Sequence, residues 1–89
     1  MLKKLKEKLS EALEIPKEIT MDFPRVTLIG KNQMYVENGK GIVTYTDSFI
    51  QIHTSCYFLK ISGVQLRIKQ MTGELMEICG DFEKIELEN

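Results

Sequence analysis

The side chains of this 89-residue chain that could perform chemistry together are one histidine and two cysteines. His53 and Cys56 are three positions apart, and Cys79 could be a third zinc ligand if its strand lay nearby. A structural zinc site needs four ligands and usually a closely spaced pair such as Cys-x-x-Cys, which the sequence lacks. Cys56 could also be a nucleophile activated by His53, but no strand-turn-helix elbow or oxyanion-forming glycine run accompanies it. We therefore predict no catalytic residue, no metal site and no cofactor, and we expect the chain not to be an enzyme.

The two cysteines also indicate a cellular compartment. The sequence has no apolar stretch typical of a signal peptide, so we expect reduced thiols in a cytoplasmic protein rather than a bridge between Cys56 and Cys79. Its longest apolar stretches are a few residues long, whereas a membrane-spanning helix needs about 20. We expect no segment that spans a membrane.

The charges are balanced overall but unevenly distributed. Lys and Arg number 12 and Asp and Glu number 13, so the chain has no net positive field and nucleic acid is not an expected partner. Residues 73–89 hold one lysine against six acids, whereas Lys60, Arg67 and Lys69 lie in a stretch without acids. These three residues could form a basic face for a partner or for self-association. Alternatively, they pair with acids on neighbouring strands of the same chain.

The elements that position these residues begin with an amphipathic helix. Leu2, Leu5, Leu9 and Leu13 recur at three- and four-residue spacing, and lysines and glutamates fill most positions between them. Pro16 disfavours helical geometry in the residue before it, so we predict a helix over residues 1–15. Its apolar face could pack on the protein's own sheet, dock on a partner, or lie in a membrane interface.

After residue 16 the hydrophobic period changes from 3.6 to 2, which is typical of β-strands. Turn-forming residues separate short alternating stretches, and Asn38-Gly39 is the strongest hairpin signal among them. Residues 16–89 are therefore predicted to be one β domain. The predicted strands are residues 26–29, 33–37, 41–46, 49–53, 57–61, 64–69, 75–79 and 83–87.

The spacing of these strands favours a mainly β fold, in which the N-terminal helix precedes a small antiparallel β-sandwich of seven to eight short strands. A small barrel is one alternative. A short β-solenoid is another, because alternating stretches precede Gly63, Gly73 and Gly80. The alternation predicts a core of Val26, Leu28, Met34, Val36, Ile50, Ile52, Leu59, Ile61, Leu66, Ile68, Met76 and Ile78.

Several segments resemble a known family. The stretch 15–30 contains "PKE", "DFPR" and "TLIG", and it is followed by "YVEN" at 35–38, "LKISG" at 59–63 and "ICG" at 78–80. Over nearly the whole chain these segments resemble the YabP/YqfC family of sporulation proteins, most closely its YqfC branch. The resemblance implies a small β-sandwich-like protein needed for endospore formation, with no catalytic residues to transfer. It also suggests a membrane-anchored sporulation protein as a partner, because a gene for such a protein tends to lie beside that of the YqfC branch.

We therefore expect a non-catalytic sporulation factor that binds a protein partner or forms a homo-oligomer. Its candidate surfaces are a sheet edge, the helix leucines, and the basic residues Lys60, Arg67 and Lys69. The alternative is a peripheral membrane-associated module that docks through its helix on a membrane-anchored sporulation protein. We expect it in the cytoplasm of the sporulating cell, or peripherally at a membrane.

Overall fold

The computed structural model describes residues 22–89, which form one antiparallel sheet of six strands in the order β1-β2-β6-β5-β4-β3. The helix predicted for residues 1–15 and the first residues of the predicted β domain lie outside the described part. No helix in residues 22–89 is long and apolar enough to cross a membrane. The strands are β1 (Arg25–Ile29), β2 (Gln33–Glu37), β3 (Gly39–Tyr45), β4 (Phe49–Thr54), β5 (Phe58–Met71) and β6 (Leu75–Glu88).

This architecture confirms the mainly β, antiparallel prediction and corrects its details. Residues 22–89 form one continuous sheet rather than the two sheets of a sandwich, and it has six strands rather than seven or eight. The sheet is open, with β1 and β3 at its two ends, so it is not a closed barrel. All neighbouring strands are antiparallel, which is incompatible with the parallel stacking of a solenoid.

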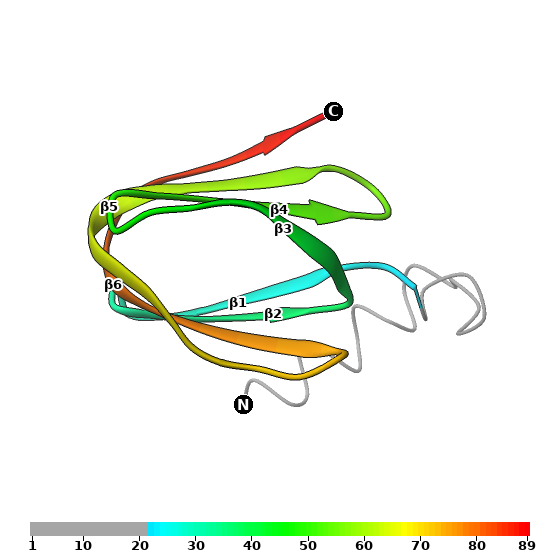
Figure 1. The fold of residues 1–89 in the computed structure, drawn as a ribbon, viewed down its shortest axis with the longest axis horizontal. Coiled ribbons are helices and arrows are strands. Elements are labelled where there is room, and N and C mark those ends of the chain that lie inside the picture. Colours follow the sequence, from blue (N-terminus) through cyan, green and yellow to red (C-terminus); the bar gives the residue numbers. More distant parts are fainter. Residues whose placement is uncertain (1–21) are drawn as a thin grey trace, which may run out of the picture.

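The strand count differs because β5 and β6 have 14 residues each, and each takes the place of two predicted strands. Strand β5 corresponds to the predicted strands 57–61 and 64–69, and β6 corresponds to 75–79 and 83–87. The pairs Ser62-Gly63 and Gly80-Asp81 separate predicted strands, where turns are expected, but both pairs lie inside strands. Figure 1 shows that the two long strands bend there, so the single sheet doubles back on itself in two layers. The β4 layer contains β3, β4, residues 58–62 and residues 82–88. The β2 layer contains β1, β2, residues 75–79 and residues 67–71.

Glycine makes the bend possible at two positions. A Cβ atom on Gly63 would overlap the carbonyl oxygen of Asp81 on the paired strand, so only glycine fits this approach. Gly80 has a φ of 145°, a conformation that side chains disfavour. Between them, the pairing of β5 with β6 shifts register between Val64 and Arg67. Such bulges increase the twist and curvature of a strand.

The turns of the β1–β2 and β3–β4 hairpins hold the bend in place. Their carbonyl oxygens accept hydrogen bonds from backbone N–H groups of β5 and β6 that the bend leaves without a strand partner. Gly63 donates to Ser48 (3.1 Å), Leu66 to Asp47 (2.7 Å), Gly80 to Asn32 (3.1 Å) and Phe82 to Lys31 (2.9 Å). Each hairpin is thereby attached to a part of the sheet far from it in sequence.

The core lies between the two layers. Its buried side chains are Met34, Val36, Ile50, Ile52, Leu59, Ile61, Leu66, Met76, Ile78 and Phe82. The predicted Val26 and Ile68 are only partly buried against this cluster. Leu28 is 49% exposed because it lies on the terminal strand β1. Phe82 was not predicted, because it immediately follows the segment expected to be a turn.

Candidate interaction surface

The structure separates the three residues that could have formed a chemical centre. His53 is exposed at the end of β4, and its ring centroid lies 5.1 Å from that of Phe58. Cys56 is exposed in the turn that follows. Cys79 belongs to the other layer, where it is paired with Arg67 across β5 and β6. Both thiols are free, and residues 22–89 contain no group of three metal-binding side chains.

The turn that holds Cys56 is organised by Thr54. The Thr54 hydroxyl donates to the carbonyl of Tyr57 (2.6 Å) and accepts from the backbone N–H groups of Cys56 (3.2 Å) and Tyr57 (3.0 Å). Burial raises the pKa of Tyr57, and the nearby Cys56 adds to the rise. In this turn the polar groups of the backbone are therefore hydrogen-bonded by a side chain of the turn itself, which is a structural role for this local sequence.

The three predicted basic residues do not share a face. Lys60 lies in the β4 layer, where its ammonium is 2.9 Å from a carboxylate oxygen of Glu88. Arg67 and Lys69 follow the bend and lie in the β2 layer, where the Lys69 ammonium is 3.9 Å from Glu77. Lys60 and Lys69 are therefore paired with acids on a neighbouring strand, which is the alternative that the sequence left open.

The candidate residues of the predicted N-terminal helix lie outside the described residues; they are Leu2, Leu5, Leu9 and Leu13. The structure describes the chain from Asp22, where it joins the sheet.

Glu77 forms a buried polar cluster that the sequence did not reveal. Glu77 is one of the six acids in residues 73–89, and it is only 5% exposed. Gln33 donates to one of its carboxylate oxygens (2.8 Å) and Gln70 to the other (2.7 Å). Because amides from β2 and β5 occupy both oxygens, Glu77 cross-links three strands. The polar positions of alternating strands carry no signal that distinguishes this cluster from an exposed face.

An open hollow of about 730 Å³ lies at the bend. A hydrogen bond to Cys79 raises the pKa of the exposed Arg67, which keeps the guanidinium positively charged. Two acids offset this charge, so the hollow has no single sign of charge. Its lining residues are Asn32, Asp47, Gln65, Leu66, Arg67, Cys79, Gly80 and Asp81.

A narrower groove runs between the free edges of β1 and the last part of β6. We call it the β1–β6 groove. It has a volume of about 190 Å³ and is lined by Leu28, Gly30, Lys31, Phe82, Glu83, Lys84 and Ile85. Three of these side chains are large and apolar, and Ile29, the next residue after Leu28 in the sequence, is 52% exposed. Exposed apolar residues also follow the opposite edge, where Val43 and Tyr45 of β3 are 54% and 49% exposed.

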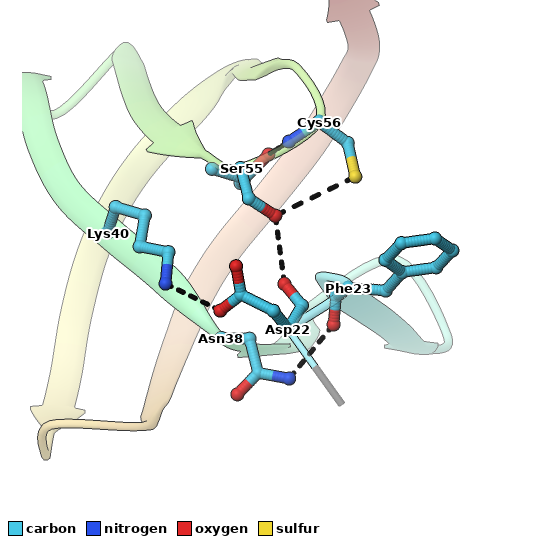
Figure 2. Close-up of polar contacts among 7 residues, drawn as sticks. Asp22, Phe23, Asn38, Lys40, Ser55 and Cys56 are labelled. Carbon is cyan, nitrogen blue, oxygen red and sulfur yellow. Dashed lines mark hydrogen bonds and ion pairs between the residues drawn. The ribbon is translucent and has the colours of Figure 1, made fainter. Parts of the chain in front are cut away.

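Residues 22 and 23 form an ion pair and hydrogen bonds with the sheet at the end opposite the bend. Figure 2 shows the Lys40 ammonium beside the Asp22 carboxylate (2.6 Å) and the Ser55 hydroxyl donating to the Asp22 carbonyl (2.8 Å). The side-chain amide of Asn38 donates to the carbonyl of Phe23 (2.9 Å). The Phe23 ring points away from these contacts and is 44% exposed. The chain therefore enters the sheet at a place defined by β3 and the β4–β5 turn.

Comparisons with known proteins agree with the sequence resemblance. The model of the YabP family matches residues 22–89, which are the residues that the structure describes. A curated relative is "Uncharacterized protein YqfC" of Bacillus subtilis (strain 168), which is 29% identical over 82 residues. That alignment covers 92% of this chain and 88% of the relative. No solved structure matches the chain.

Proposed function

Because the chain belongs to the YabP family, a family of sporulation proteins, we propose that it is a non-catalytic factor of endospore formation that acts by binding other protein chains. The observation that supports this function is the open sheet, whose terminal strands β1 and β3 carry exposed apolar side chains. Its partner is a sporulation protein or a further copy of the chain, met in the cytoplasm of the sporulating cell.

The physical basis of the proposal is strand addition. A terminal strand has a row of N–H and C=O groups with no partner in the sheet, and an extended segment of another chain can pair with them. Apolar side chains beside the edge add area that is buried on binding. In this protein Leu28 and Ile29 of β1 and Val43 and Tyr45 of β3 occupy such positions.

Complementation of a deletion strain tests whether catalysis is needed. A variant that combines His53→Ala with Cys56→Ser removes the side chains best suited to chemistry, and both positions are exposed, so the fold is retained. We expect this variant to form heat-resistant spores at the wild-type frequency. Loss of spores, with a normal amount of folded protein in the cell, would contradict a non-catalytic role.

A second candidate function is docking at a membrane through the helix predicted for residues 1–15, on a membrane-anchored sporulation protein. The contacts of Asp22 and Phe23 favour it, because they attach the start of the described chain to the sheet. A membrane or protein bound by residues 1–21 would therefore be held close to the sheet. Flotation with anionic vesicles separates direct lipid binding from protein binding. Binding that is lost on Leu5→Glu would support a helix in the membrane interface, and no binding at all would exclude direct lipid contact.

A further inference from the structure

We propose that β1 is a self-association edge, along which a second copy of this chain pairs antiparallel with the first and covers the β1–β6 groove. The inference rests on the proposed function, and it names one partner and one surface for it. Three observations carry it: the other free edges are obstructed, β1 is regular, and the sequence of β1 matches itself in one register.

The free edge of β3 is irregular. Its pairing with β4 shifts register between Gly39 and Gly41 and again between Ile42 and Thr44. Bulges of this kind twist an edge away from a flat pairing surface and are a common protection against strand addition. For pairing with a second copy of the chain, the β3 edge is therefore a poorer template than a regular edge.

The free edges of the two long strands are obstructed in other ways. After the bend, the N–H of Ile68 in β5 donates to the hydroxyl of Tyr45 (2.9 Å). In β6 the N–H of Phe82 donates to a turn carbonyl, and the residues after it include Glu83, Glu86 and Glu88. Charged side chains along an edge are a common protection against strand addition.

Within residues 22–89, strand β1 has none of these obstructions. All five of its residues pair with β2 without a register shift. Its one charged residue, Arg25, is directed along the sheet toward Glu37 of β2, at 3.7 Å. Leu28 and Ile29 are 49% and 52% exposed, so a strand paired with β1 would bury apolar surface as well as backbone groups.

The sequence of β1 selects one register for a symmetric pair. With the two-fold axis at Thr27, Leu28 of each copy lies opposite Val26 of the other, and Arg25 lies opposite Ile29. An axis at Val26 would place Leu28 opposite Pro24, which has no N–H group to donate.

An axis at Leu28 is excluded by charge, because it would place Arg25 of one copy opposite Lys31 of the other. Of these three registers, the one with its axis at Thr27 has apolar pairs, no proline opposite β1 and no like-charge pair. It also places two threonines side by side, a favourable cross-strand pair.

This arrangement accounts for the groove. A strand added to β1 lies along its free edge, where Leu28, Phe82 and Ile85 line the β1–β6 groove. Because the paired segment is only five residues long, the interface is smaller than a standard one, and the dimer is weak and depends on concentration.

Sedimentation equilibrium of the full chain over a wide concentration range tests the proposal. We expect a monomer–dimer equilibrium. Leu28→Lys places two ammonium groups in the interface and raises the dissociation constant at least tenfold. The matched control is Val64→Lys in β5, where the native side chain is equally exposed at 49%, and it leaves the constant unchanged. Circular dichroism checks that both variants are folded.

A cross-link tests the register without relying on a loss of association. Thr27→Cys in a Cys56→Ser background brings two thiols together on the two-fold axis, at a separation suited to a disulfide between antiparallel strands. We expect a covalent dimer on mild oxidation, and none from Thr44→Cys on β3 in the same background.

A full chain that stays monomeric at every concentration, or cross-linking through Thr44→Cys instead, would overturn the β1 dimer. The proposed function would remain open to its own test, because a different protein could still use these edges.

Discussion

The bend in β5 and β6 leads to a prediction about one methyl group. Gly63→Ala adds a Cβ atom that would overlap the carbonyl oxygen of Asp81 and lie 3.1 Å from the Leu66 side chain. The main obstacle is backbone on the paired strand, so the strain cannot be relieved by rotating a side chain. The two long strands must separate locally, which also strains the hydrogen bond from Gly63 to Ser48.

The size of the effect follows from these two losses. Overpacking that forces the backbone to move costs about 1 to 3 kcal/mol, and a weakened hydrogen bond about 1 kcal/mol more. We expect Gly63→Ala to lower the free energy of unfolding by about 2 to 4 kcal/mol. A chain of this size has a total stability of roughly 4 to 13 kcal/mol, so the loss is a large fraction of it.

Urea unfolding followed by circular dichroism measures this loss, with Gly73→Ala as the control. Gly73 lies between β5 and β6, and a Cβ there would have no atom within 4 Å, so we expect a change within about 0.5 kcal/mol. For Gly63→Ala the midpoint falls by roughly 1 to 3 M urea. If both variants unfolded at the wild-type midpoint, the close approach of β5 and β6 at the bend would be refuted.

Three further predictions concern single side chains. Leu59 is buried and Leu87 is its exposed cross-strand partner, so Leu59→Ala should lower the free energy of unfolding by about 2 to 5 kcal/mol in urea and Leu87→Ala by much less. Glu77→Ala leaves the amides of two glutamines without their acceptor and should cost about 1 to 3 kcal/mol in the same assay, whereas Glu83→Ala, at an exposed position, should be nearly neutral. Because burial raises the pKa of Tyr57, the folded protein holds the phenol proton more tightly than the unfolded chain, and stability should fall as the pH rises above about 10. Thermal melts at increasing pH should show a smaller alkaline loss for Tyr57→Phe, and an equal loss in both proteins would contradict the assignment.

The fold also explains how a small protein obtains a core from one sheet. A flat sheet of six strands would bury one face only if another element covered it. Bending β5 and β6 lets each half of the sheet cover the other, so residues as distant as Val36 and Ile52 both lie near Gly39 in one core. The same bend leaves β1 and β3 at the ends of an open sheet, which connects the architecture to the proposed mode of binding.

Local sequence determined which side chains face the core. The period of two places Met34, Val36, Ile50 and Ile52 on the buried side whatever the strands pair with, because successive side chains in a strand point to opposite faces. It also indicated the mainly β class, and the family was recognisable from short segments. None of these inferences depends on contacts between distant residues.

Only the tertiary structure shows whether a glycine forms a turn or a bend, and whether a polar side chain is buried or exposed. Gly63 and Gly80 have the same local signal whether they form turns or bends inside long strands, and the pairing of β5 with β6 selects the second. Glu77 resembles any solvent-facing acid until Gln33 and Gln70 are brought to it from two other strands. Whether a strand edge is free depends on the order of all six strands. Local sequence specifies the direction of a side chain, but its neighbours are set by pairings between residues far apart in the chain.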